Sequence, residues 1–300
     1  MHKLSNNSGQ DMRVWITGAN GQLGRQLMRQ IPIGAVAFSP DRLQVDMLNL
    51  SAAMPLIDRF SPTHIINAAA FNNVDQAQLD TRAAWSLNHI AVRQLAEIAN
   101  QHAARLVHIS TDFVFDGTAT EPYLPTSATN PISEYGKSKE AGEHAALTVC
   151  SNSIVIRTAS LYALNGRNFV NSVLAGLALH KSIEVVNDQT SSPTHAASLA
   201  QCVWRFAPRS ETGVWHFTDA GSVNKFSFAQ AIADEAFESG LLSSQKQVVA
   251  IKPGSLVTKA IRPSFSVLNK DATWSIVGTP PEWRDQLRKY LCTLTRPTDA

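Results

Sequence analysis

Short β-branched apolar runs alternate with longer stretches of helical periodicity through the first half of the chain. The runs have the composition and length of buried strands, whereas the longer stretches repeat apolar residues at helical spacing. The pattern predicts strands at Arg13–Thr17, Val36–Phe38, His64–Ala68, Arg105–Ile109 and Ser153–Arg157. It predicts helices at Gln22–Gln30, Ser51–Phe60, Thr81–His102 and Lys137–Leu147. Strands separated by such helices indicate an α/β fold with a doubly wound parallel sheet, covered by helices on both faces.

The alternation weakens after Tyr162, where Pro, Ser and Asn become frequent between the apolar segments. In this half the pattern predicts helices at Asn168–His180, His195–Phe206, Phe226–Glu238 and Glu282–Leu291, and strands at Ser182–Asn187 and Gly213–Thr218. The less regular order indicates a second, smaller α/β lobe with an interleaved path.

The expected division of the chain follows from these patterns. Residues 12–162 are expected to form the larger domain, with return segments near residues 194–219. Residues 163–193 and 220–300 are expected to form the smaller lobe. Residues 1–11, MHKLSNNSGQD, are polar and are expected to be a disordered extension.

Composition narrows the classes of protein. The 26 basic and 24 acidic residues give a net charge of +2 without a basic block, which argues against nucleic-acid binding. No apolar run reaches the roughly 18 residues of a membrane span, and the N-terminus lacks a signal-peptide pattern, so we expect a cytoplasmic protein without a membrane partner. The cysteines, Cys150, Cys202 and Cys292, are expected to be free thiols. The histidines show no metal-ligand spacing, and no metal is predicted.

The first predicted strand runs into a glycine-rich turn with the spacing GxxGxxG. Glycines there permit positive φ, a close approach of pyrophosphate to the backbone, and tight packing of the next helix on the sheet. The free N–H groups and partial positive charge of that helix N-terminus attract phosphates. Because the turn is the first strand-to-helix connection, it predicts a Rossmann dinucleotide site. The expected cofactor-binding residues are Gly18, Asn20, Gly21, Gln22, Leu23 and Gly24.

The end of the second predicted strand lacks the carboxylate that usually binds the adenosine ribose. Ser39 and Arg42 stand there instead, and Arg42 is placed to meet a 2′-phosphate, which favours NADPH over NADH; a solvated loop charge is the alternative. Asp46 either accepts a hydrogen bond from the adenine amino group or caps a helix. Small side chains after the third strand let the backbone approach the cofactor: Ala68, Ala69 and Ala70.

Tyr135 and Lys139 form a YxxxK pair, which a helix places on one face. A nearby ammonium lowers the pKa of a tyrosine, so Tyr135 is expected to donate a proton to a carbonyl being reduced, while Lys139 also holds the nicotinamide ribose. Thr111 ends the fourth strand, where such sheets bind ligands, and is the candidate to hydrogen-bond the carbonyl; a simple turn residue is the alternative. Asn88 either holds a water in a proton relay or is an amide on the helix surface.

Together these motifs resemble the extended short-chain dehydrogenase/reductase superfamily, and most of all its dTDP-4-dehydrorhamnose reductase branch. The matching segments run from Met12 to about Trp283: ITGANGQLG, NAAAFNNVDQAQ, HISTDFVFDG, ISEYGKSKEAGE, NDQTSSPT and IRPSFSVLN. The resemblance implies reduction of a nucleotide-linked 4-keto-6-deoxy sugar by NADPH (or NADH), with dTDP-4-dehydrorhamnose as the expected substrate and dTDP-rhamnose as the product. It allows a homodimer.

The resemblance also implies roles for individual residues. It makes Tyr135 the acid, Lys139 its support and Thr111 the group that polarises the ketone. The larger domain then binds the dinucleotide, and the smaller lobe binds the nucleotide sugar. The substrate-binding residues that it implies are Thr111, Asp112, Phe113, Asn168, Phe169 and Arg262.

The sequence departs from the family pattern at two places. Ser160 stands where relatives carry a tryptophan beside the sugar, which leaves the identity of the sugar open. Gln26 and Ala197 stand where some relatives carry acidic residues associated with a magnesium-bridged dimer. Two alternatives to the expected function follow: a sister sugar-nucleotide reductase of other specificity, or a non-catalytic NADP-binding regulatory subunit, such as the β subunit of methionine adenosyltransferase.

Overall fold

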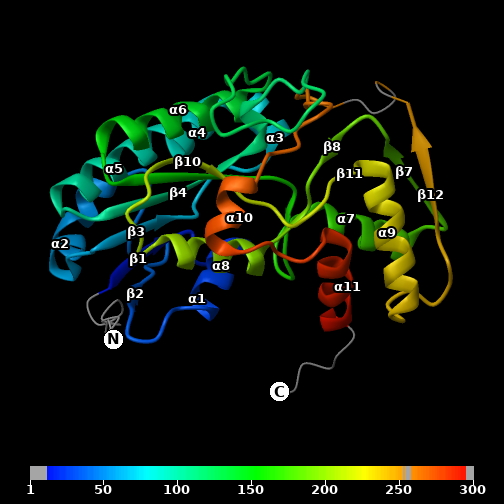
Figure 1. Cartoon of the computed structure of the whole chain (residues 1–300), viewed down its shortest axis with the longest axis horizontal. Coiled ribbons are helices and arrows are strands. Elements are labelled where there is room, and N and C mark those ends of the chain that lie inside the picture. The colour runs from blue at the N-terminus through cyan, green and yellow to red at the C-terminus, as the bar shows by residue number, and fades with distance from the viewer. Residues whose placement is uncertain (1–11, 253, 255–257, 295–300) are drawn as a thin grey trace.

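The computed structural model describes residues 12–252, 254 and 258–294, and a six-stranded parallel sheet lies at its centre (Figure 1). The strands are β1 (Arg13–Thr17), β2 (Val36–Phe38), β3 (His64–Asn67), β4 (Arg105–Thr111), β5 (Ser153–Thr158) and β10 (Gly213–His216). Their spatial order is β2-β1-β3-β4-β5-β10, and every neighbouring pair is parallel. The order reverses between β1 and β3, and α/β sheets bind ligands at the carboxyl ends of the strands beside such a reversal.

Helices cover both faces of this sheet. One face carries α1 (Gln22–Arg29) and α8 (Ala196–Phe206), and the other carries α2 (Leu50–Phe60), α5 (Ala91–Gln101) and α6 (Glu134–Val149). Successive side chains of β4 point to opposite faces of the sheet. Val107 packs with α1 and α8, whereas Leu106 packs with α5 and α6. The doubly wound α/β fold predicted from the sequence pattern is confirmed.

A smaller group of elements lies to the right of the sheet in Figure 1 and has its own core around Val170, Phe228 and Leu287. Its main elements are α7 (Phe169–Leu179), β7 (Ser182–Val186), α9 (Lys225–Glu238), β12 (Gln247–Ile251) and α11 (Trp283–Leu294). The strands β7 and β12 pair in parallel. Two short pairs connect this lobe to the rest: β6 (Leu161–Tyr162) with β9 (Thr194–His195), and β8 (Thr190–Ser191) with β11 (Val223–Asn224).

Some elements differ from the sequence prediction. The single helix predicted over Thr81–His102 is divided into α4 (Thr81–Trp85), a π-helical turn at Ser86–Ile90 and α5. The helix α6 begins three residues earlier than expected because the Ser133 side chain caps it, accepting from the Gly136 N–H at 3.2 Å. The pattern does not predict α3 (Val74–Leu79), α10 (Asp271–Val277) or β12, which are too short for a clear period.

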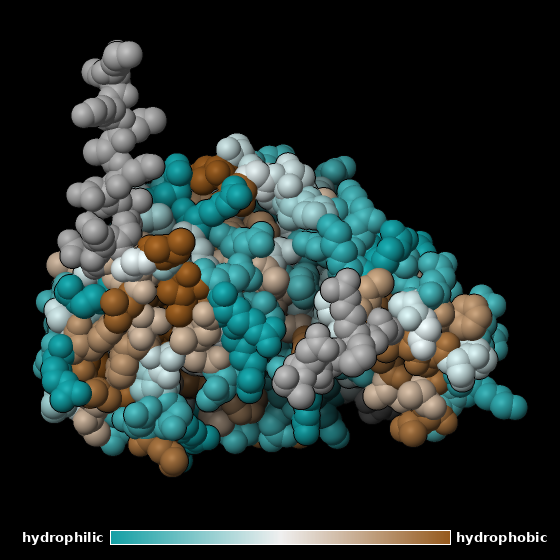
Figure 2. All heavy atoms as spheres, turned by 90° about the horizontal axis from the view of Figure 1, so that it is seen from below, coloured by the Kyte–Doolittle hydropathy of each residue, from teal (hydrophilic) through white to brown (hydrophobic). Residues whose placement is uncertain are grey.

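The surface is mixed in character. The face seen from below carries apolar side chains in separate groups toward the two ends of the molecule, with hydrophilic residues between them (Figure 2). Among the residues that the structure describes, no helix has the length and apolar character needed to cross a membrane. The extension expected for residues 1–11 lies outside the described residues.

Candidate active site

A continuous cleft runs along the carboxyl ends of the strands. One part, of about 510 Å³, lies over the glycine turn and the end of β2. A second part, of about 380 Å³, lies between the end of β4, the start of α6 and the second lobe. The two parts share Gly21, Ala68, Ala69, Ala70 and Asn72 in their walls. A ligand of dinucleotide length can therefore extend from one part into the other, at the place where α/β sheets bind such ligands.

The glycine turn is packed so closely that larger residues do not fit. Gly18 has φ +67°, and a Cβ on it would lie 2.7 Å from the Ala69 backbone nitrogen. A Cβ on Gly24 would lie 2.1 Å from the Gly18 carbonyl oxygen. Gly21 stands at the N-cap of α1 without any side chain to satisfy the free N–H groups of the first helical turn. These groups are the donors that a pyrophosphate requires, so the turn fits a dinucleotide.

Replacing Gly24 with alanine is expected to weaken NADPH binding at least about tenfold and to lower the free energy of unfolding by about 1–3 kcal/mol, because its Cβ would overlap backbone that cannot move aside. Fluorescence titration with NADPH and chemical denaturation measure the two effects. Gly176→Ala is the matched control in another helix, since its Cβ would meet only the Ile183 side chain, at 3.1 Å. Equal behaviour of the two variants would contradict the role of the turn.

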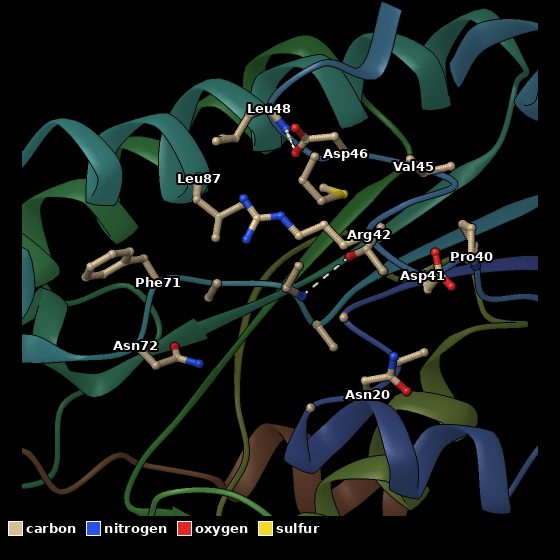
Figure 3. Close-up of a pocket in the computed structure, with 18 of the residues that line it drawn as sticks. Asn20, Pro40, Asp41, Arg42, Val45, Asp46, Leu48, Phe71, Asn72 and Leu87 are labelled. Carbon is tan, nitrogen blue, oxygen red and sulfur yellow. Dashed lines mark hydrogen bonds between the residues drawn. The ribbon is translucent and has the colours of Figure 1, made fainter. Parts of the chain in front are cut away.

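The adenosine end of the cleft contains most of the residues expected there (Figure 3). Arg42 lines the cavity, and its guanidinium extends into it toward Leu87. Asp46 also lines the cavity, and its carboxylate accepts from the Leu48 N–H at 3.0 Å. Asp46 is not the helix cap, because Asn49 occupies the N-cap of α2. Ser39 lies in neither wall of the cleft.

Thr111, Tyr135 and Lys139 meet in the second part of the cleft. Because α6 begins at Glu134, Tyr135 and Lys139 lie one helical turn apart on the face that meets the end of β4. The Lys139 Nζ donates to the Ile109 carbonyl oxygen at 2.7 Å, which fixes the ammonium beneath the cleft. The ring of Tyr135 packs edge-on against Phe113, with 5.7 Å between the ring centroids.

The charge state of Tyr135 differs from the expectation. The pKa of Tyr135 is raised to about 12, because burial and, to a smaller extent, the Asp112 carboxyl outweigh a hydrogen bond with Thr111 that lowers it. The expectation that Lys139 lowers this pKa is therefore wrong for this arrangement, in which desolvation is the largest effect. The phenol is protonated at neutral pH, as a proton donor must be.

Lys139 is supported by a buried ion pair. Burial lowers the pKa of its ammonium to about 8, and the Glu143 carboxylate, one turn further along α6, raises it. Glu143 in turn accepts from Arg157 on β5, with distances of 2.7 and 2.9 Å, and both side chains are buried. The pair keeps a compensated negative charge near Lys139 in the interior.

Asp112 links the end of β4 to the second lobe. Its buried carboxylate accepts from the Thr111 hydroxyl at 3.1 Å and from the Ser266 hydroxyl. Burial raises the pKa of Asp112 to about 6, and these two hydrogen bonds lower it. Asp112 and Phe113 both line the cleft, as the resemblance implies for substrate-binding residues.

The three residues that the resemblance assigns to the second lobe have different positions. Phe169 and Arg262 line the cleft. Asn168 lies outside its walls: it caps α7 by accepting from the Asn171 N–H at 2.9 Å, and its amide donates to the Gln22 Oε1 at 2.8 Å. Asn168 thus ties the second lobe to the N-terminal end of α1.

The lining residues that the sequence analysis does not single out as ligands include Arg167, Lys225 and Ser160. Ser160 has φ 44° and its hydroxyl lies 2.7 Å from the Ser191 hydroxyl, so two small polar residues stand at the place where the family resemblance leads us to expect a tryptophan. One feature of the sequence could have identified Lys225 as a candidate: it stands at the start of a predicted helix, where the helix dipole disfavours a cation. Among the described residues, no three His, Cys, Asp or Glu side chains gather as a metal site.

Asn88 is fully buried in the π-helical turn, so the surface-amide alternative is wrong. Its Oδ1 accepts from the Phe71 N–H at 2.8 Å, and its Nδ2 donates to the Phe71 carbonyl and the Ser138 hydroxyl at 3.1 and 3.0 Å. The amide therefore holds the loop after β3 against α6. This loop forms part of the wall that both parts of the cleft share.

Known proteins resemble the chain over almost its whole length. The RmlD substrate binding domain family matches residues 12–296. A dTDP-4-dehydrorhamnose reductase of Aggregatibacter actinomycetemcomitans is 36% identical, over 92% of this chain and 97% of the relative. A probable dTDP-4,6-dihydroxy-2-methyloxan-3-one 4-ketoreductase of Streptomyces antibioticus is 37% identical, over 93% and 94%.

A solved structure shows the same similarity in three dimensions. The dTDP-4-dehydrorhamnose reductase of Bacillus anthracis, in complex with NADP, has a TM-score of 0.88 and 31% identity, covering 94% of this chain and 99% of that one. Since sequence and fold agree over nearly the full length, this chain belongs to the RmlD substrate binding domain family.

Proposed function

We propose that the chain is an NADPH-dependent reductase that converts dTDP-4-dehydrorhamnose to dTDP-rhamnose. The observation that carries this proposal is the meeting of Thr111, Tyr135 and Lys139 in a cleft whose other part lies over the glycine turn. Relatives named for this reaction match the chain over most of their length. The geometry and the relatives thus support the same chemistry.

The residues of the chain fit NADPH, which supplies the hydride when bound. The chain itself must orient the sugar and provide a proton. Tyr135 keeps its phenolic proton at neutral pH and donates it to the carbonyl oxygen as negative charge develops there. Lys139, fixed on the Ile109 carbonyl, places a positive charge beneath the phenolate that remains.

Thr111 requires a small rearrangement to take part. In the structure its hydroxyl donates to Asp112, so its hydrogen is already used in a bond within the protein. Rotation about the Cβ–Oγ bond turns the hydrogen toward the substrate without moving the backbone, because hydroxyl hydrogens turn to suit their acceptors. Thr111 then polarises the carbonyl while the Asp112 carboxylate keeps its bond from Ser266.

The decisive test is NADPH oxidation, followed at about 340 nm, with dTDP-4-dehydrorhamnose generated in situ. Turnover that produces dTDP-rhamnose is the expected result. NADPH binding without turnover of any 4-keto sugar nucleotide would instead favour the regulatory-subunit alternative. The homodimer stays a prediction, which sedimentation in the same buffer tests.

A sister reductase with another sugar is the second candidate. The exposed Ser160 hydroxyl, bonded to Ser191 at the cleft wall, favours it, because a smaller and more polar wall changes which sugar fits. The Streptomyces antibioticus relative is named for a different keto sugar. Comparing kcat/KM for the two dTDP sugars named by these relatives decides between the candidates.

Arg42 is expected to determine the preference for NADPH. Its guanidinium extends into the adenosine end of the cleft, so Arg42→Ala should raise the KM for NADPH about tenfold or more and leave the KM for NADH nearly unchanged. Steady-state kinetics with both cofactors measures this. The exposed Arg59 on α2 provides the control variant Arg59→Ala, which should change neither KM. Equal changes for both cofactors would show that Arg42 does not meet the 2′-phosphate.

A further inference from the structure

Besides Lys139, three cationic side chains line the substrate part of the cleft: Arg167, Lys225 and Arg262. Arg262 is already paired, because its guanidinium donates to both Asp75 carboxylate oxygens, at 2.7 and 3.3 Å. Asp75 also accepts from the backbone N–H groups of Lys259 and Ala260. Arg262 therefore fastens the start of α3 to the second lobe, and little of its charge remains for a ligand.

Lys225 is in a different state. Its Nζ donates to a neutral acceptor, the Gln189 Oε1, at 3.0 Å and lies 5.4 Å from the centre of the Phe169 ring. Within the described residues its ammonium has no ion pair with a carboxylate. Lys225 lines the same cavity as Thr111 and Tyr135.

The surroundings of Lys225 disfavour its charged form in the chain without a ligand. The pKa of its ammonium is lowered to about 8, mainly by burial and in second place by the charge of Arg262. Asp188, Asp75 and Asp112 act in the opposite direction from a distance. Lys225 is also the first residue of α9, directly after the N-cap Asn224, and the helix dipole disfavours a cation there. A partly buried cation at the N-terminal end of a helix, with no carboxylate paired to it in the described part of the chain, fits a site for an external anion.

We propose that Lys225 binds the diphosphate of the sugar nucleotide and that Arg262 serves only to join the two lobes. This inference rests on the proposed function, because the diphosphate is the anion that a sugar nucleotide brings into this cavity. A ligand with its carbonyl at Tyr135 then has its anion within the same chamber, beside Lys225 and Phe169. The cofactor also contains a diphosphate group, but its expected binding place is the glycine turn.

The test compares Lys225→Met with the wild type by calorimetric titration of the full chain saturated with NADPH. The probes are dTDP, UDP and thymidine. The variant is expected to bind dTDP about 10- to 100-fold more weakly, as for loss of a charged hydrogen bond, and to bind thymidine as the wild type does. NADPH affinity should be unchanged. The melting temperature should stay the same or rise, because an unfavourable cation is removed.

The control variant is Lys246→Met, which changes a lysine of the same lobe whose Nζ donates to the His180 carbonyl at 3.4 Å. It should bind all probes normally. Unchanged dTDP binding by Lys225→Met would overturn the proposal, as would a wild type that binds neither diphosphate. Equal losses for dTDP and thymidine with a lower melting temperature would show a structural role instead. Loss of NADPH affinity alone would assign Lys225 to the cofactor.

The outcomes also separate this inference from the proposed function. If Lys225→Met binds dTDP more weakly but the wild type reduces no keto sugar, the Lys225 site is supported and the proposed reaction is contradicted. If Lys225→Met reduces dTDP-4-dehydrorhamnose with an unchanged KM, the proposed reaction is supported and the Lys225 site is contradicted. A raised KM with nearly unchanged kcat is the expected result, because the diphosphate is bound equally in the ground and transition states.

Discussion

Replacing Tyr135 with phenylalanine is expected to lower kcat about 10²- to 10⁴-fold, the usual loss when a general acid is removed. The variant keeps the aromatic ring that packs against Phe113, so the fold and the walls of the cleft are preserved. It loses only the phenolic hydroxyl, whose proton burial keeps on the oxygen by raising the pKa to about 12. Stopped-flow and steady-state measurements of NADPH oxidation give the change in kcat, and fluorescence titration should show nearly unchanged NADPH affinity.

Tyr123→Phe is the matched control. Tyr123 is as buried as Tyr135, stacks on Phe115 with 4.0 Å between centroids, and donates its hydroxyl proton to Asp116 at 2.9 Å outside the cleft. Its variant should lose some stability and keep its kcat. Comparable turnover by Tyr135→Phe and the wild type would remove Tyr135 from the mechanism.

Much of the fold follows from local pattern. The strands β1, β2, β3 and β5 agree with prediction to within about a residue. The strands β1, β3 and β5 are apolar runs buried in the centre of the sheet, whereas β2 is a half-exposed edge strand that its short apolar run still marks. Prediction fails where a tertiary contact overrides the local signal. The helical periodicity through Leu87 and Ile90 gives no sign of the π-helical turn, whose Asn88 is held by the loop after β3 and by Ser138 on α6.

The residues of the site likewise include some that the sequence predicts and some that it does not. Residues within a motif, such as Gly18 and Gly24 or Tyr135 and Lys139, are predictable because spacing along a helix or turn fixes their geometry. The pairing of Arg262 with Asp75 is not, since 187 positions separate them along the chain. The burial of the Tyr135 side chain is equally unpredictable from its YxxxK motif, and this burial raises rather than lowers the pKa of Tyr135.

Breaking the ion pair beneath Lys139 is expected to produce the largest loss of stability. Arg157→Met leaves the Glu143 carboxylate buried without its two hydrogen bonds, at 2.7 and 2.9 Å. Removing one partner of a buried pair costs about 3–5 kcal/mol of the free energy of unfolding, because an uncompensated charge remains in the interior. Urea denaturation followed by circular dichroism measures the loss. Arg209→Met is the control, since its partner Glu211 lies at the surface and such pairs contribute about 1 kcal/mol or less.

The double variant Glu143→Gln, Arg157→Met distinguishes charge compensation from simple packing. With both charges removed, no carboxylate is left unpaired, so most of the lost stability should return. The Glu143 carboxylate raises the pKa of Lys139, and its loss therefore lowers that pKa below its value of about 8. The Lys139 ammonium then loses its proton at lower pH, and the alkaline limb of the kcat profile should move in the same direction. A profile that coincides with the wild type would mean that Glu143 stabilises the fold without acting on Lys139.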